Sequence, residues 1–268
     1  MGFATIKFAE PEPGVGFITL SRPDRLNALS LDMVEELHAL FGQLQHREQI
    51  RVLIITGEGR GFCSGADLRD SRIHGEAAGG FPSAARHLEA IQKKYANLIL
   101  EMRRLPQPII ALVNGPAAGG GMSLALASDV VIAGPAATFT PSFINIGLSS
   151  GEMGTTFFLP KLVGSARAAE ILLTGCTVHA AEAEKIGLVC RVVEPEQLME
   201  AAREMARTML AKSPLGLRFT KEALNLNLTA VSLEAAIELE NRNQSICCCT
   251  PEFFREIEAF NKRRSSRK

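Results

Sequence analysis

The sequence is organised around one stretch, residues 114–129, which reads NGPAAGGGMSLALASD. The apolar run before it, 109–113, is short and branched enough to predict a buried strand. Three glycines at 119–121 are followed by 122–127, whose residues favour a helix. A glycine turn between a strand and a helix N-terminus leaves backbone N–H groups open to close approach by a ligand. This stretch therefore predicts a site for a phosphate or an oxyanion.

A second stretch repeats this design. Residues 51–57, RVLIITG, predict a buried strand, and residues 61–68, GFCSGADL, follow it as a glycine-bearing loop. Two such loops can each direct one N–H at the same oxygen, which is the geometry of an oxyanion hole. Taken alone, either loop can instead be a tight turn between a strand and a helix, without a chemical role.

Composition narrows the class of protein. Lys plus Arg and Asp plus Glu both number 29, so no overall basic field favours nucleic acid as a partner. No apolar run is long enough to span a bilayer, and the N-terminus lacks the features of a secretory signal. We therefore expect a cytoplasmic protein without a membrane span. The six cysteines show no CxxC spacing, so we expect reduced thiols and no metal site.

The order of predicted elements indicates an α/β protein with a helical end. Strands mix with helices in residues 1–195, whereas 196–268 read as helices only, which suggests a core followed by a C-terminal helical region. An amphipathic helix is expected at 86–104, after a segment, 71–85, that has no period and is typical of a surface loop. The expected C-terminal helices are 196–211, 214–228, 233–249 and 251–262.

Three motifs together resemble those of the crotonase family, also called the enoyl-CoA hydratase/isomerase superfamily. They are RPDRLNALS at 22–30, GFCSGADL at 61–68 and NGPAAGGGMSLALASD at 114–129, in the family's order and spacing. The resemblance runs from about Phe17 to the C-terminus. It implies a ββα spiral core, a C-terminal helical region that builds a homotrimer or a dimer of trimers, and an acyl-CoA thioester as the partner. Coenzyme A is then part of the substrate, with no separate cofactor.

The resemblance also assigns residues to the site. It implies that the backbone N–H groups of Ala66 and Gly120 hold the thioester oxygen, where preset donors stabilise developing negative charge. The residues it assigns to coenzyme A are Arg25, Leu26, Ala28, Ser64, Gly65, Ala66, Asp67, Leu68 and Gly120. Arg25 suits a phosphate, although an exposed loop arginine can equally be solvated.

The sequence departs from the family where hydratases carry their two catalytic glutamates. These positions fall on Ser123 and Phe143, so the two-glutamate addition of water cannot run in this chain. Glu152 is the remaining candidate for general acid/base catalysis, and matching it to the aspartate of dienoyl-CoA isomerases requires a one-residue gap. Its alternative reading is a carboxylate that complements a helix N-terminus. Ser123 is a weaker candidate as a nucleophile, because no histidine lies in a partner motif.

A single carboxylate beside an oxyanion hole favours double-bond isomerisation or other single-base chemistry over hydration. The sequence therefore predicts an acyl-CoA-binding enzyme of the hydratase/isomerase type, with Ala66, Gly120 and Glu152 as its catalytic residues. The alternative is a non-catalytic protein that binds acyl-CoA or assembles with partners and has lost hydratase activity. The loss of both expected glutamates is the feature that favours this alternative.

Overall fold

The main sheet joins segments that lie far apart in the sequence. In residues 2–74 and 83–265, which the computed structural model describes, it has six strands, all neighbours being parallel except the antiparallel first pair. In spatial order these strands are β1 Ile6–Glu12, β2 Val15–Leu20, β3 Val52–Gly57, β4 Ile109–Val113, β6 Val130–Ala133 and β9 Arg191–Val192.

Helices cover both faces of this sheet, so its central strands are buried on both sides. The helices up to residue 210 are α1 Leu31–Leu44, α2 Ala84–His87, α3 Lys93–Arg104, α4 Gly120–Ala127, α5 Thr155–Val163, α6 Ser165–Thr174, α7 Ala180–Lys185 and α8 Leu198–Leu210. In β3, Val52 and Ile54 belong to one core with α8, whereas Leu53 and Ile55 belong to a larger core with α1 and α3. The alternation follows from the two-residue repeat of a strand.

A second, smaller sheet is formed by one strand directly before the glycines at 119–121 and two strands that follow them in the sequence. It consists of β5 Pro116–Ala118, β7 Thr138–Thr140 and β8 Val178–His179, with β5 parallel to β7. Helix α4 begins two residues after β5, and all eight of its residues are buried. The start of α4 is thus held inside the protein by both sheets. Short 3₁₀ turns occupy Pro23–Arg25, Ser71–His74, Ile144–Ile146 and Pro195–Gln197.

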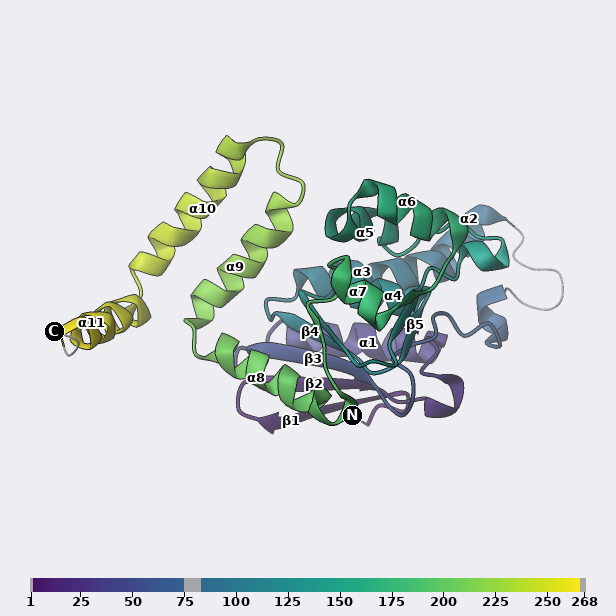
Figure 1. The fold of residues 1–268 in the computed structure, drawn as a ribbon, viewed down its shortest axis with the longest axis horizontal. Coiled ribbons are helices and arrows are strands. Elements are labelled where there is room, and N and C mark those ends of the chain that lie inside the picture. The colour runs from purple at the N-terminus through teal and green to yellow at the C-terminus, as the bar shows by residue number, and fades with distance from the viewer. Residues whose placement is uncertain (1, 75–82, 266–268) are drawn as a thin grey trace.

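The last three helices project from the core. They are α9 Pro214–Asn227, α10 Leu233–Cys248 and α11 Pro251–Ser265, and Figure 1 shows them standing away from the sheet. Lys221 ties α9 to the core, because its buried Nζ lies 2.9 Å from Asp129 Oδ2 and donates to the Gln107 carbonyl at 2.7 Å. Burial lowers the pKa of Lys221, and the Asp129 charge opposes that shift.

Most expected elements are confirmed, with two corrections. The mixed α/β core and the four C-terminal helices are present. The helix expected at 86–104 begins earlier, at Ala84, and contains a π-helical turn at Leu88–Gln92. The segment expected as a loop at 71–85 starts with a 3₁₀ turn, and 75–82 lie outside the described residues. The division at 195/196 stays a prediction, although the last strand ends at Val192.

No helix among the described residues combines the length and the apolar character needed to cross a membrane.

Candidate active site

The two glycine loops meet because they follow neighbouring parallel strands. β3 and β4 are adjacent, so the loops at their carboxyl ends leave the same edge of the sheet. Beyond the strands, a parallel bridge continues the pairing: the Cys63 N–H donates to the Pro116 carbonyl at 3.1 Å, and the Ala118 N–H donates to the Cys63 carbonyl at 2.9 Å. The backbone itself therefore fixes the distance between the loops.

Gly65 is where the two loops come closest. Its φ is +89°, and a Cβ added there would lie 2.8 Å from the Ala118 carbonyl oxygen and 3.3 Å from the Gly120 nitrogen. Only glycine combines this backbone conformation with this approach. Ala66 follows directly, and Gly120 is the first residue of α4, so its N–H has no acceptor within the helix. Neither the Ala66 N–H nor the Gly120 N–H donates to another described residue.

Ala66 is held in place by Leu29. The Leu29 N–H donates to the Gly65 carbonyl at 2.8 Å, and the Asp67 N–H donates to the Leu29 carbonyl at 3.0 Å. The buried Tyr95 hydroxyl, from α3, donates to the same Leu29 carbonyl at 2.8 Å, and its burial raises its pKa. The Ala66 amide is thus the open donor in a segment whose flanking amides and carbonyls are engaged.

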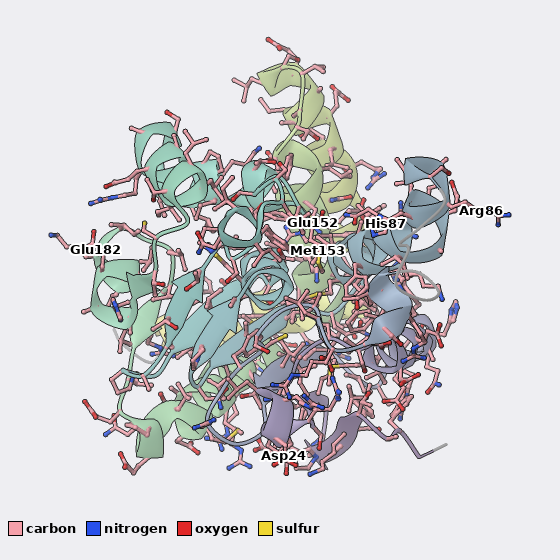
Figure 2. All side chains as sticks on the ribbon, turned by 90° about the vertical axis from the view of Figure 1, so that its right-hand side faces the viewer. Asp24, Arg86, His87, Glu152, Met153 and Glu182 are labelled. Atoms are coloured by element: carbon pink, nitrogen blue, oxygen red, sulfur yellow. The ribbon has the colours of Figure 1, made fainter. Side chains whose placement is uncertain are left out.

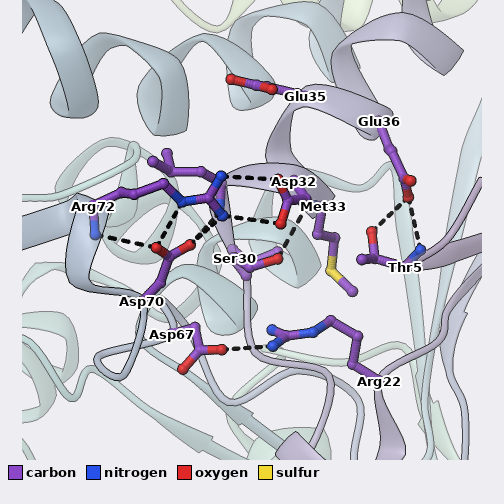
Figure 3. A network of polar contacts seen from close by, with 12 residues as sticks. Thr5, Arg22, Ser30, Asp32, Met33, Glu35, Glu36, Asp67, Asp70 and Arg72 are labelled. Carbon is purple, nitrogen blue, oxygen red and sulfur yellow. Dashed lines mark hydrogen bonds and ion pairs between the residues drawn. The ribbon is translucent and has the colours of Figure 1, made fainter.

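Arg22 closes the same loop from the other side (Figure 3). Its guanidinium contacts Asp67 Oδ2 at 2.7 Å and donates to the Ala28 carbonyl at 2.6 Å. Burial by itself raises the pKa of Asp67, but the hydrogen bonds from Arg22 and from the Arg69 amide outweigh it, so the pKa is lowered. The ion pair fastens the 22–28 segment to the loop that carries Ala66.

The residues expected to contact coenzyme A are brought together. The Ser64 N–H donates to the Leu26 carbonyl at 3.0 Å, and the Ser64 hydroxyl donates to the Arg25 carbonyl at 3.2 Å. Arg25 and Leu68 are exposed, whereas the side chains of Ala28 and Asp67 are buried. The Asp67 carboxylate is engaged by Arg22, and its expected contact with coenzyme A stays a prediction.

The two positions that the resemblance assigns to glutamates have other roles here. Ser123 is fully buried, and its hydroxyl donates back to the Gly119 carbonyl at 3.3 Å, so it is no open nucleophile. Phe143 is 8% exposed and packs on Gly119: two of its ring carbons lie 3.6 Å from where a Cβ on Gly119 would be. An apolar wall therefore stands beside the Gly120 donor, where the resemblance expects an acid.

The residue that follows Glu152 lies against the same donor. Met153, the next residue, has a φ of +46°, and its Sδ lies 3.1 Å from where a Cβ on Gly120 would be. The Glu152 side chain is half-buried, and the Gln92 amide donates to its Oε2. Figure 2 shows Glu152, Met153 and His87 in one region of the molecule. The structure thus brings Ala66, Gly120 and Glu152 to one side of the fold.

The surroundings of Glu152 act on its charge. Burial raises the pKa of this carboxyl, and the hydrogen bonds from Gln92 and the Met153 amide, with the charge of His87, offset part of the rise. Its backbone is fixed by Thr155, whose N–H donates to the Glu152 carbonyl at 3.0 Å. A partly desolvated carboxylate with few partners is suited to accept a proton.

Sequence reasoning missed several residues of this region. Arg22 lies within the RPDRLNALS motif, but its link to Asp67 is not visible from spacing. Tyr95 and Gln92 both lie in the helix expected at 86–104, and neither was singled out there. The available signal was an uncharged polar side chain directly after the apolar Ile91.

Comparisons with known proteins find similar sequences and structures over most of the chain. The sequence model of the enoyl-CoA hydratase/isomerase family matches residues 10–267. A probable enoyl-CoA hydratase of Mycobacterium bovis is 43% identical over 236 residues, which cover 87% of this chain and 81% of the relative. A putative enoyl-CoA hydratase of Streptomyces coelicolor is similar in structure, with a TM-score of 0.90, 35% identity and coverage of 98% and 93% of the two chains. A structure described as a monofunctional enoyl CoA isomerase from Mycobacterium smegmatis is 41% identical, with a TM-score of 0.73 and coverage of 87% and 98%.

Proposed function

The chain belongs to the enoyl-CoA hydratase/isomerase family, and within that family we propose that it moves a double bond along an acyl-CoA thioester. The crotonase-like fold expected from the sequence is confirmed by the structural neighbours. The family acts on acyl-CoA thioesters. Which reaction this member performs is the proposal.

The observation that carries the proposal is one half-buried carboxylate, Glu152, whose neighbour Met153 contacts Gly120, while the other carboxylate of the site, Asp67, is paired with Arg22. Addition of water across a double bond requires one group to activate water and another to deliver a proton. Here the positions of the two hydratase glutamates hold a buried hydroxyl, Ser123, and an apolar ring, Phe143. Moving a double bond needs only a proton taken from one carbon and returned to another, which one carboxylate, Glu152, can do.

The proposed steps follow from the geometry of the donors. The Ala66 and Gly120 N–H groups bind the thioester oxygen, and Glu152 takes a proton from the α-carbon of a β,γ-unsaturated acyl group. The C–H electron pair shifts into the enolate, whose negative charge rests on the oxygen between the two donors. When the double bond re-forms between the α- and β-carbons, Glu152 returns the proton to the γ-carbon. Atoms and charge balance without a further reactant.

The remaining assigned residues are proposed to bind coenzyme A. Residues 25–28 and 64–68 lie side by side, with the Arg25 guanidinium exposed at their surface. A guanidinium there can pair with a phosphate of the substrate. The apolar Leu68, which is also exposed, can lie against the adenine. Coenzyme A then enters and leaves as part of the substrate.

The projecting helices support a further proposal, assembly into a homotrimer or a dimer of trimers. They bound a cleft of about 670 Å³ between α9 and α10 and leave large apolar side chains uncovered. Such surface is expected to be buried against other copies of the chain. The exposed side chains are Leu224, Leu226, Leu228, Val231, Leu233, Ile237, Ile246, Phe253, Phe254, Ile257 and Phe260. Light scattering is expected to give three or six chains per particle; a monomer would contradict this.

The test of the proposed reaction compares two substrates and two variants. We expect the wild type to convert a β,γ-unsaturated acyl-CoA to its α,β-isomer and to hydrate crotonyl-CoA poorly. Glu152→Gln is expected to lower kcat for isomerisation by roughly 10²–10⁴-fold, because general acid/base catalysis is lost, while calorimetry shows little change in acyl-CoA affinity. Glu89→Gln, an exposed carboxylate paired with Lys93, is the matched control and should keep full activity.

Three results would overturn this assignment in different ways. Full isomerisation by Glu152→Gln would exclude Glu152 as the proton carrier. Rapid hydration of crotonyl-CoA without isomerisation would exclude the proposed reaction. Binding of acyl-CoA with neither reaction would favour the non-catalytic alternative. The absence of both hydratase glutamates is the sequence feature that supports that alternative.

A further inference from the structure

The helix that faces Glu152 is irregular at the point of contact. Helical backbone runs without a break from Ala84 to Arg104, but Leu88–Gln92 form a π turn, in which the Lys93 N–H donates to the Leu88 carbonyl five residues back. The wider turn rotates the helix before it, so Leu88 is 45% exposed although regular spacing from Ile91 would bury it. π turns inside α-helices are frequent at functional sites.

Gln92 is the last residue of this turn and reaches Glu152 across 60 residues of sequence. Its Nε2 donates to Glu152 Oε2, and the Met153 backbone amide also favours the ionised carboxylate. The main chain of Glu152 is fixed separately, by Thr155 at the start of α5. Thr155 therefore fixes the backbone of Glu152, and Gln92 fixes the position of its carboxylate.

We propose that Gln92 is a positioning residue, whose amide holds the Glu152 carboxylate in the orientation from which it takes and returns the substrate proton. The inference rests on the proposed role of Glu152 and deepens it. The π turn is the structural means, because it ends at Gln92 while the residues after it, Tyr95 and Leu98, keep their place in the core. Gln92 acts through Glu152 and contacts no reacting atom.

The inference predicts the direction in which loss of Gln92 shifts the pKa of Glu152. Burial raises the pKa of Glu152, and the Gln92 hydrogen bond lowers it, because a donor favours the ionised form. Of the titratable side chains described around it, His87 on α2 acts on the Glu152 charge and lowers the pKa further. Glu89, on the same π turn, is exposed and paired with Lys93. α5 contributes only the Thr155 hydroxyl and backbone.

The test uses two variants of Gln92, one that removes the hydrogen-bond donor and one that gives it a positive charge. For each, kcat for isomerisation is measured against pH. Gln92→Met keeps the length and removes the donor, so the acid limb should move up by about one pH unit and kcat should fall about tenfold, with KM changed less than about twofold. Gln92→Lys supplies a charged donor, so the acid limb should move down. Glu89→Gln is the control on the same turn and should leave the profile unchanged.

The outcomes separate this inference from the proposed function. If Glu152→Gln is inactive but Gln92→Met retains the wild-type acid limb and kcat, the role of Gln92 is wrong and that of Glu152 stands. If Glu152→Gln is active, the proposed function itself fails. Because the charge of His87 also lowers the pKa of Glu152, the Gln92→Met shift must appear in a His87→Gln background as well. Thermal unfolding of each variant shows whether a loss of kcat reflects a loss of fold. A loss of fold would not move the acid limb of the pH profile up in Gln92→Met and down in Gln92→Lys.

Discussion

The two sides of the candidate site are built in different ways. The donor side, Ala66 and Gly120, uses backbone N–H groups that strand pairing and a helix start leave open, and its loops are joined by repeated hydrogen bonds. The base side is one half-buried carboxylate, Glu152, which accepts a hydrogen bond from the Gln92 side chain and lies in the field of His87. The donor side is fixed by the fold, whereas the base side is adjusted by individual side chains.

This difference fits the role that is proposed for each side. Oxyanion donors act best when they need no reorganisation during the reaction, and backbone amides held by neighbouring backbone meet that requirement. A base must change its charge in each cycle, so it needs surroundings that make its two protonation states close in free energy. Partial burial of Glu152 provides this at the expense of stability, because it disfavours the ionised form.

On the donor side, a large effect is expected from separating the two donor loops. Gly65→Ala places a methyl group 2.8 Å from the Ala118 oxygen and 3.3 Å from the Gly120 nitrogen, so the loops must move apart. We expect kcat/KM for isomerisation to fall by roughly 10²–10³-fold, the usual effect of losing one oxyanion donor. Steady-state kinetics measure this loss.

Gly164→Ala is the matched control for Gly65→Ala. Gly164 has a similar positive φ, +80°, but a Cβ there meets no atom within 4 Å. Both variants bear the backbone strain of a left-handed residue, and only Gly65→Ala disturbs the donors. Equal losses of activity in the two variants would show that strain, rather than the separation of Ala66 from Gly120, accounts for the effect.

A smaller effect is expected on folding stability, and it should have opposite signs when the carboxylates of Asp67 and Glu152 are replaced. Asp67 has a lowered pKa and stabilises the fold above its unfolded pKa, near 3.8, so Asp67→Asn should reduce the unfolding free energy at pH 7 by about 1–2 kcal/mol. Glu152 has a raised pKa and destabilises the fold once it ionises above about 4.5. Glu152→Gln should therefore raise the melting temperature at pH 7, by on the order of a degree.

Both stability differences depend on pH with a defined sign. As the pH falls below 4.5, wild-type Glu152 is protonated and the advantage of Glu152→Gln should disappear. The deficit of Asp67→Asn should narrow at lower pH, as wild-type Asp67 is protonated in turn. Denaturant unfolding at a series of pH values measures both. A stabilised Asp67→Asn protein, or a destabilised Glu152→Gln protein, would contradict the contrast between the two sides.

The donor side could be predicted from the sequence because its signals are local. A buried strand followed by a glycine loop appears twice in the sequence, once with a helix start after it, and adjacent parallel strands bring such loops together. Glu152 was selected because Ser123 and Phe143 hold the two hydratase positions, and because the resemblance matches it, with a one-residue gap, to the aspartate of dienoyl-CoA isomerases. Gln92 could not be predicted, because a π turn changes which residues of a helix share a face and leaves no sequence period of its own.

Exchange of α-protons in heavy water tests the central account most directly. A saturated acyl-CoA has α-protons but no double bond to move, so exchange reports only the enolate that both sides of the site form together. We expect the wild type and Gly164→Ala to incorporate deuterium at the α-carbon, and Gly65→Ala and Glu152→Gln to lose this exchange, as followed by mass spectrometry. Exchange by Glu152→Gln at the wild-type rate, or none by a wild type that binds the thioester, would contradict the account.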